Sequence, residues 1–242
     1  MFNYKITIQY DGTQYAGWQI QENAITVQEV MTNSIEKILQ EKINLIGAGR
    51  TDAGVHALGQ VANFLVNKHL DLYKFKYSLN SVLPKDIAIT SIEFVEEDFH
   101  ARFSAKKRSY IYLISNRKSP FFDKYSYTFF SDFEQDKLNL LSSIFIGQKD
   151  FTSLSKINPE VQSKVCEVYE ARWRRQKNLF IFYIEANRFL YGMVRAIVGS
   201  ILKAYKEDAG VNYLQDLLLQ KDRNSAPDAV PAKGLFLYKV KY

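Results

Sequence analysis

Apolar and polar side chains alternate over residues 2–10, which is typical of a half-buried β-strand. The stretches GQVANFLV (residues 59–66) and DIAITSIEFV (residues 86–95) have the β-branched and aromatic composition of two further strands. Between the first two strands, Thr26 stands three residues before Glu29, the spacing of a helix capping box. Apolar residues then recur at helical intervals for about a dozen residues. A second helix is expected over residues 70–83, ending before Pro84.

The second half of the chain repeats this mixture of elements. Its periodicity predicts strands at 110–115, 165–175, 179–186 and 234–242, and helices at 136–146, 189–205 and 212–220. The sequence therefore predicts an α+β fold made of two similar halves, residues 1–104 and 105–242. We expect each half to be a mainly antiparallel sheet with helices on one face, and the two sheets to join into one continuous sheet with a central cleft.

Composition places the chain among globular proteins, with 242 residues, 47% hydrophobic and 24% charged. Its one cysteine, Cys166, cannot form an internal disulfide, and its three histidines lack the spacing of a zinc site, so we expect no metal. The first residues do not resemble a signal peptide, and no apolar run is long enough to span a bilayer. A cytoplasmic location is the expectation.

The net positive charge of the chain indicates the class of partner. The formal net charge is +6 and the pI is about 9.1, with 16 tyrosines and 17 phenylalanines. Positive charge interleaved with aromatic rings suits nucleic acid. Basic clusters occur at residues 106–108 and at 172–175, where arginines flank Trp173. Each cluster is equally typical of a solvated charged face.

One glycine-rich stretch carries candidate chemistry: GAGRTDAGVHALGQVANF, residues 47–64, with a single carboxylate, Asp52. It is neither a dinucleotide fingerprint nor a P-loop. Asp52 could cap a turn. It could also be half of a hydrolase pair, with Glu96, Glu97 or Asp98 as the second acid. His56 could act as a base, although no nucleophile lies beside it in the sequence.

This stretch closely resembles the signature of the tRNA pseudouridine synthase A family. Further segments resemble the same family, appear in the same order and cover almost the whole chain: YDGTQYAGWQIQ, TVQE, DFHARFSAKKRSYIY, GQKDFTSL, NRFLYGMVRAIVGS and GLFL. The resemblance implies an isomerase that converts uridine to pseudouridine at positions 38, 39 and 40 in the anticodon stem-loop of tRNA. It also implies a homodimer that binds RNA in the central cleft and uses no metal or cofactor.

The resemblance implies that Asp52 is the catalytic nucleophile. Moving the base from N1 to C5 changes no oxidation state, so one carboxylate that attacks and is later released suffices. A carboxylate enclosed around a base must be kept charged, because desolvation raises its pKa. The family pattern assigns this task to Arg195, since a guanidinium can hold a carboxylate with two hydrogen bonds.

Other roles follow from the same resemblance. Arg50 would take the place of the flipped uridine. Tyr110 would stack on the uracil and could accept the C5 proton, with Tyr112, two residues along the same strand face, as its competitor. Substrate contacts are expected from Lys106, Lys107, Arg108 and Leu235, the last as a pocket wall beside Phe236, although core packing is an equal alternative for Leu235.

One departure from the pattern stands before the M-V-R element, where Gly192 replaces the histidine common in the family. It puts a local contact in doubt, and also the start of the helix. Two other functions stay open at this stage. A pure RNA-binding or chaperone module would give Asp52 no chemistry, and a two-carboxylate hydrolase would release free uracil or sugar.

Overall fold

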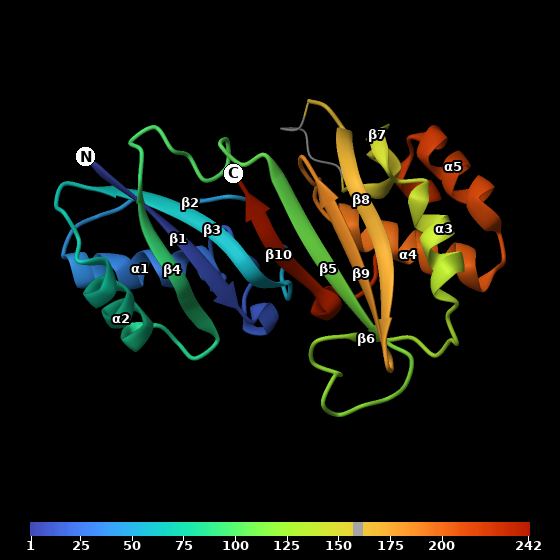
Figure 1. Ribbon diagram of the computed structural model, residues 1–242, viewed down its shortest axis with the longest axis horizontal. Helices are drawn as coiled ribbons and strands as arrows, with labels where there is room; N and C mark the ends of the chain where they lie inside the picture. Colours follow the sequence, from blue (N-terminus) through green and yellow to red (C-terminus); the bar gives the residue numbers. More distant parts are fainter. Residues whose placement is uncertain (157–161) are drawn as a thin grey trace. The chain divides into compact units, whose positions relative to one another are not determined.

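The computed structural model describes residues 1–156 and 162–242, and these form two compact units (Figure 1). The first unit contains residues 1–106 and 236–242, and the second contains residues 107–235. Each unit combines a sheet with helices, which confirms the predicted α+β class. The central cleft between the predicted halves stays a prediction.

The sheet of the first unit has the strand order β4-β1-β3-β10. Strand β1 pairs antiparallel with β3 and β4, and β10 runs parallel to β3. Tyr4, Ile6 and Ile8 of β1 are fully buried, as the alternation predicts. The strands are β1 (Phe2–Tyr10), the short β2 (Ile46–Gly47) beside β3, β3 (His56–Val66), β4 (Ile87–Val95) and β10 (Leu235–Lys241).

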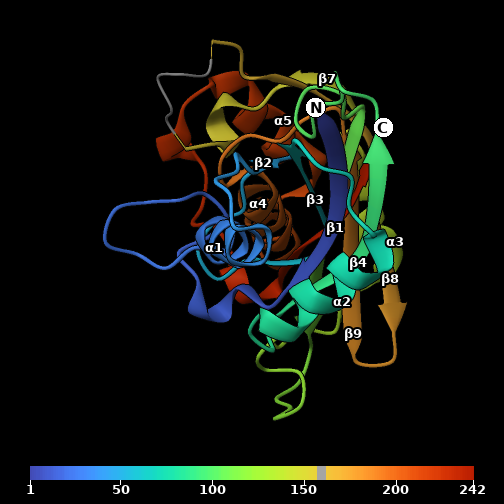
Figure 2. The ribbon, with the colours of Figure 1, turned by 90° about the vertical axis from the view of Figure 1, so that its left-hand side faces the viewer.

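Two helices cover this sheet (Figure 2). Helix α1 (Val27–Leu39) begins at Thr26, whose side chain accepts a hydrogen bond from the Glu29 amide at 3.3 Å, as the capping spacing predicts. Helix α2 (Leu72–Val82) begins at Asp71 in the same way. Phe75 of α2 contacts Phe64 of β3 with ring centroids 6.0 Å apart, so α2 covers the face that also buries Tyr4.

The second unit has the order β5-β9-β8-β7, with all three pairs antiparallel. Its strands are β5 (Lys107–Ser115), β6 (Tyr127–Thr128), β7 (Gly147–Asp150), β8 (Val165–Gln176) and β9 (Leu179–Ala186). Strands β6 and β7 were not predicted, because two or four residues are too few to show a period. Phe180, Phe182 and Ile184 of β9 are fully buried and form the centre of the core.

Three helices complete this unit: α3 (Gln135–Ser143), α4 (Met193–Lys206) and α5 (Gly210–Gln220). The predicted start of α4 at residue 189 is wrong by four residues, because Gly192 has φ 73°, a left-handed conformation outside an α-helix. Gly192 is the residue before the helix, so it does not weaken the helix interior. The other end of α4 agrees with the prediction to within one residue.

Candidate active site

Asp52 lies in the loop between β2 and β3, and we call residues 47–55 the Asp52 loop. Asp52 is half-buried, whereas Arg50 is exposed and Thr51 is buried. The loop has no regular structure, yet backbone and side-chain hydrogen bonds hold it along its whole length. A fixed backbone is what a catalytic side chain requires.

The first set of these bonds comes from the segment after β1. The Trp18 amide donates to the Thr51 carbonyl at 3.1 Å, and the Gly54 amide donates to the Tyr15 carbonyl at 3.3 Å. The hydroxyls of Tyr10 and Thr51 lie 2.7 Å apart, and both residues are buried. The residue directly before Asp52 is therefore held at its carbonyl and at its side chain.

The second set comes from β3. The Ala48 amide donates to the Val61 carbonyl at 2.7 Å, and the Gln60 side-chain amide donates to the Gly49 carbonyl at 2.8 Å. Gln60 is fully buried. Tyr10, Trp18 and Gln60 were not among the predicted site residues, although Tyr10 and Trp18 stand in the Y-D-G-T-Q-Y-A-G-W segment and Gln60 stands in the glycine-rich stretch with Asp52.

Close backbone approach explains two glycines near Asp52. Gly17 has φ +95°, and a Cβ there would collide with the Thr51 carbonyl oxygen and lie 3.1 Å from the Asp52 carbonyl carbon. A Cβ on Gly47 would collide with the indole of Trp18, a side chain that is 2% exposed. These glycines serve packing of the loop against its own unit.

His56 follows the loop and is buried. Its Nδ1 lies 3.1 Å from the Gly12 amide nitrogen and 3.1 Å from Asp11 Oδ1, so it can accept from the first or, when protonated, donate to the second. Its ring stacks on Phe236 with centroids 4.6 Å apart. These contacts fix the entry of β3, which gives His56 a structural task.

The three acids that the sequence offered as a hydrolase partner, Glu96, Glu97 and Asp98, do not lie near Asp52. Residues 96–98 follow β4 at the end of the sheet where Asn3 faces Leu65, while Asp52 precedes His56 at the other end of β3. Nine residues of strand separate these ends, which is roughly 30 Å at ~3.3 Å per residue. These three residues are therefore excluded as the second acid of a hydrolase.

Arg50 is directed by a neighbour in its own unit. Its Nε donates to Gln19 Oε1 at 2.7 Å while the residue stays exposed. A guanidinium held at one nitrogen and open to solvent suits contact with RNA, whether by phosphate binding or by filling a vacated base position.

In the second unit, Arg195 is the third residue of α4 and is half-buried. Its Nε donates to the Val230 carbonyl at 2.7 Å, and the Val230 amide donates back to the Arg195 carbonyl at 3.3 Å. Val194 and Ala196 on either side are buried. The helix N-terminus and the guanidinium both favour an anion here. Asp52 belongs to the other unit, so its pairing with Arg195 stays a prediction.

The two candidate tyrosines of β5 differ in what their hydroxyl groups do. Tyr112 is fully buried, and its hydroxyl donates to the Pro231 carbonyl at 2.8 Å. Burial raises the pKa of Tyr112 far above its usual value, so it stays a neutral donor. Tyr110 is 7% exposed and packs edge-on against Phe189, with centroids 5.0 Å apart. Of the two, Tyr112 is structural, and Tyr110 is the better candidate for catalysis.

Comparison with known proteins identifies the family. A family model described as tRNA pseudouridine synthase matches residues 6–104 and 141–242. Relatives named tRNA pseudouridine synthase A are 42% identical over 248 residues in Thermoanaerobacter sp. (strain X514) and 41% identical over 244 residues in Clostridium acetobutylicum, covering 100% of both chains in each case. The relative from Bacteroides fragilis is 39% identical over 241 residues, covering 99% of this chain and 96% of its own. The chain belongs to the tRNA pseudouridine synthase A family.

Membership of this family makes the chain an isomerase that acts on tRNA uridine, as the sequence predicted, and excludes a pure binding module. Among solved structures, the crystal structure of the archaeal box H/ACA sRNP Nop10-Cbf5 complex aligns with a TM-score of 0.37 and 13% identity, covering 82% of this chain and 42% of that one. That likeness is too low to add to the assignment.

A tRNA pseudouridine synthase needs a basic surface, and part of the predicted one is already engaged within the protein. Lys107 lies 3.6 Å from Glu185 and 4.2 Å from the ring centre of Tyr169, and Arg108 donates to the Asn187 carbonyl at 3.0 Å. Lys106, in the first unit, is exposed.

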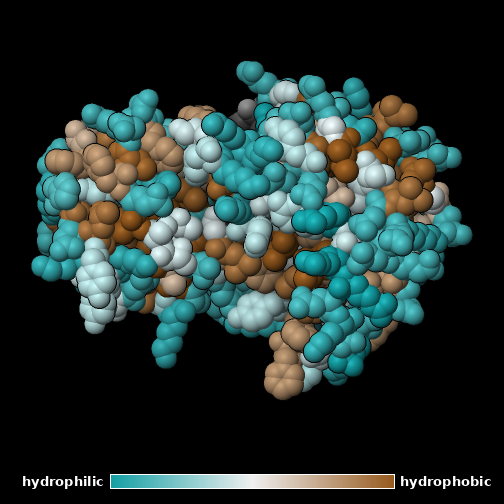
Figure 3. All heavy atoms as spheres, viewed as in Figure 1, coloured by the Kyte–Doolittle hydropathy of each residue, from teal (hydrophilic) through white to brown (hydrophobic). Residues whose placement is uncertain are grey.

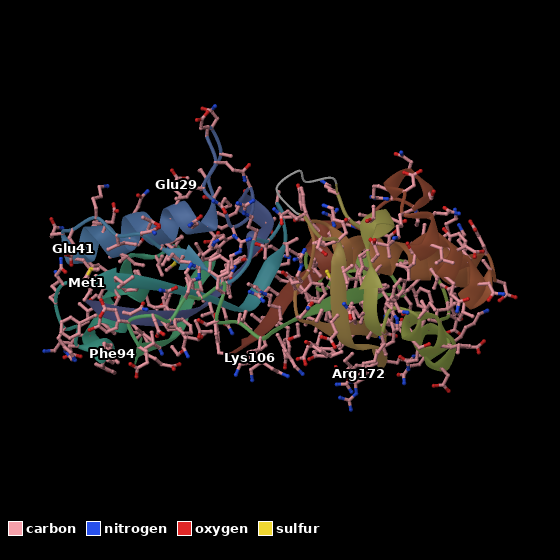
Figure 4. All side chains as sticks on the ribbon, turned by 90° about the horizontal axis from the view of Figure 1, so that it is seen from above. Met1, Glu29, Glu41, Phe94, Lys106 and Arg172 are labelled. Atoms are coloured by element: carbon pink, nitrogen blue, oxygen red, sulfur yellow. The ribbon has the colours of Figure 1, made fainter. Side chains whose placement is uncertain are left out.

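The exposed residues of β8 include Val165 and Tyr169 in its first half, while the surface over its second half is largely hydrophilic (Figure 3). Arg172 and Arg174 are exposed there, and Arg172 stands at the surface of the strand in Figure 4. Trp173 faces the other way, is 2% exposed and donates to Ser142 Oγ at 2.8 Å. It therefore belongs to the core, and it does not offer RNA a stacking surface as the sequence suggested.

Leu235 and Cys166 are both buried. Leu235 is 5% exposed at the start of β10. Cys166 is buried, and burial raises the pKa of its thiol, so it is a poor nucleophile. Within residues 1–156 and 162–242, no cluster of three or more histidine, cysteine or acidic residues could hold a metal ion. In the same residues, no helix has the length and hydrophobicity to cross a bilayer.

Proposed function

We propose that the chain converts uridine to pseudouridine at positions 38, 39 and 40 in the anticodon stem-loop of tRNA, with Asp52 as the nucleophile. The observation that carries the role of Asp52 is the anchored loop, in which a half-buried carboxylate follows a threonine held by Trp18 and Tyr10. A loop held this way presents one acid in a constant position. The names of the relatives support the activity itself.

The proposed reaction needs one carboxylate. Asp52 attacks C1′ of the ribose or C6 of the base while the N1–C1′ bond breaks. The base turns, C5 bonds to C1′, and the carboxylate leaves unchanged. The proton on C5 is then lost, with Tyr110, stacked on the uracil, as the proposed acceptor, and N1 takes up one proton, so the product is an isomer of the substrate. Oxidation states are the same before and after, so the steps need no electron carrier.

Arg195 is proposed to keep Asp52 ionised. Enclosure around a base raises the pKa of a carboxyl group, and a guanidinium beside it lowers that pKa again. Arg195 suits this role because the Val230 carbonyl fixes its Nε and the residue is half-buried in the first turn of α4. Arg50 is proposed to fill the place of the flipped uridine. Lys106, Lys107, Arg108 and Leu235 are proposed to contact the substrate.

The proposal includes a homodimer in the cytoplasm. Apolar surface is available for association on the connection between β5 and α3, where Phe121 is 86% exposed and Phe130 is 76% exposed. Exposed aromatic groups in such numbers mark interaction surfaces. Sedimentation of the purified protein measures the oligomeric state directly.

The decisive experiment compares Asp52→Asn with Asp11→Asn on unmodified tRNA. Asp52→Asn should bind tRNA with unchanged Kd, because phosphate contacts dominate affinity, and should form no pseudouridine. Asp11 caps the turn after β1, and asparagine caps equally well, so Asp11→Asn should retain most of the activity.

The positions of pseudouridine are mapped along the product tRNA, and the reaction is assayed for free uracil. Pseudouridine formation by Asp52→Asn would refute the nucleophile. Release of uracil by the wild-type protein would favour a hydrolase. Modification only outside the anticodon stem-loop would refute the proposed positions.

A further inference from the structure

Residues 96–104, between β4 and β5, have no role in the proposed reaction, yet hydrogen bonds hold them to the sheet and to the C-terminus. We call residues 96–104 the 96–104 turn. It runs beside the C-terminus in Figure 1, and Tyr242, the last residue, donates its hydroxyl to the Ala101 carbonyl at 2.8 Å. The rings of Phe99 and Tyr242 also contact each other, with centroids 4.9 Å apart.

Two buried asparagines of the sheet hold the same turn. Asn3 is 0% exposed and Asn63 is 1% exposed, on the face opposite Tyr4 and Phe64. The Asn3 side chain donates to the Phe99 carbonyl at 2.8 Å, and Asn63 donates to the Asn3 side chain at 3.0 Å. The Ala101 amide donates to the Asn63 oxygen at 2.9 Å. Burying a side-chain amide is unfavourable unless it forms hydrogen bonds. The hydrogen bonds of these two asparagines satisfy their amides and fix the position of the turn.

Hydrogen bonds between residues of the turn also hold it in shape. Nδ1 of His100 accepts from the backbone amides of Arg102 at 3.2 Å and Phe103 at 3.3 Å. The Ser104 amide donates to the His100 carbonyl at 2.9 Å. The backbone that carries Arg102 and Phe103 is thus fixed by its own histidine as well as by the sheet.

What this rigid turn presents is a cation and a flat ring. Phe103 is 75% exposed, its ring centroid lies 5.4 Å from the Arg102 guanidinium carbon and 4.4 Å from the centroid of the His100 ring. The turn thus holds a flat apolar ring at the surface beside a guanidinium, an arrangement on which a planar group of a partner can stack.

We propose that the 96–104 turn is a second contact for tRNA, in which Arg102 meets a backbone phosphate and Phe103 stacks on a base. A guanidinium beside an aromatic face is the combination that single-stranded or unstacked nucleotides require. The substrate of the family is a polyanion, and the turn leads directly into Lys106, whose amide donates to the Lys241 carbonyl at 2.9 Å. Figure 4 shows Lys106 on the side of the unit away from α1 and Glu29.

The turn also carries three acidic residues, Glu96, Glu97 and Asp98, which precede Arg102 and Phe103 in the sequence. Glu97 lies 3.3 Å from the amino group of Met1, and Glu93 on β4 lies 2.9 Å from Lys5. The Ala101 amide is anchored at Asn63, seven residues along β3 from His56, so the turn lies roughly 23 Å along the strand, at ~3.3 Å per residue, from the end of β3 that Asp52 precedes. The contact therefore involves nucleotides other than the target uridine.

The test measures tRNA binding by Arg102→Ala/Phe103→Ala in an Asp52→Asn background, where no turnover occurs. This proposal rests on the proposed function, and failure of the two is distinguishable because binding is read without chemistry. We expect Kd for unmodified tRNA to rise about tenfold, and the slope of log K against log salt to fall by about 0.7 to 0.9 for the lost phosphate contact.

A matched control removes an equally exposed cation and ring elsewhere in the unit. Tyr73 and Lys74 of α2 are both exposed, Tyr73 at 82%, and Tyr73→Ala/Lys74→Ala should leave Kd unchanged. Tyr242→Phe removes one anchor without touching the exposed pair and should raise Kd by a smaller factor. Unchanged Kd and salt slope for Arg102→Ala/Phe103→Ala would overturn the proposal. A change of oligomeric state with unchanged Kd would assign the turn to a protein partner and also overturn it.

Discussion

At the scale of single residues, the hydroxyl pair of Tyr10 and Thr51 gives the first prediction. Thr51→Val keeps the shape of the side chain but removes its hydrogen bond to the buried Tyr10 hydroxyl, so the residue before Asp52 is held less firmly. We expect the single-turnover rate to fall roughly tenfold to a hundredfold, because small displacements of reacting groups have effects of that size. Thr51→Ser, which retains the hydroxyl, should stay near the wild-type rate. Equal rates for Thr51→Val and wild type would show that this bond does not position Asp52.

The two tyrosines of β5 give the second prediction. Tyr112→Phe leaves the Pro231 carbonyl without its donor and should cost about 1 to 2 kcal/mol of the free energy of unfolding, measured by denaturant titration. The rate per folded molecule should not change. Tyr110→Phe should do the opposite, slowing the reaction with little effect on stability. If only Tyr112→Phe slowed the reaction, Tyr112 would be the catalytic tyrosine and Tyr110 a structural one.

How far the residues of the site could be predicted depends on whether their neighbours are close in sequence. Asp52 and Arg50 stand within one distinctive motif, so the sequence could single them out. Tyr10 and Gln60 support that motif from β1 and β3, and no local pattern shows which strand residues turn toward a loop. Trp173 was misjudged for a different reason: it stands among arginines in the sequence, but the alternation of the predicted strand places it on the face opposite Arg172 and Arg174, where it is buried.

At the scale of elements, amphipathic helices and long strands were predicted well because their periods extend over many residues. The boundaries and the shortest strands were not. The start of α4 shows why, since the left-handed residue Gly192 sets where the helix begins without changing the hydrophobic period.

The conformation of Gly192 gives a prediction at this scale. Gly192→Ala should cost about 1 to 2 kcal/mol in the free energy of unfolding, because a Cβ disfavours φ 73°. Gly192→Asn should cost less, as asparagine tolerates that conformation. Equal stability of the alanine variant would mean that the loop relaxes.

At the scale of the whole molecule, the path of the chain was the hardest feature to predict. The last residues return to the first unit, where β10 pairs with the start of β3 at Phe236 and His56. Strand pairing between the two ends of a chain leaves no local pattern. The same return brings Tyr242 to the 96–104 turn, so the C-terminus takes part in a surface that the sequence did not suggest.

The proposed homodimer gives the last prediction, a test of whether one tRNA spans both subunits. Arg172→Ala/Arg174→Ala removes two exposed arginines from β8, and Asp52→Asn removes the proposed nucleophile. Neither variant alone should modify tRNA efficiently at low tRNA concentration. The two variants are unfolded, mixed in equal amounts and refolded, so that about half of the dimers are heterodimers. If the basic surface of one subunit serves the site of the other, each heterodimer has one site with both an intact Asp52 and an intact basic surface. About one quarter of wild-type activity should then return. Mixing Asp52→Asn with Arg195→Lys should restore nothing if both residues act within one subunit. Activity that stays absent in the first mixture, with heterodimers demonstrated by mass, would show that each subunit binds its tRNA alone.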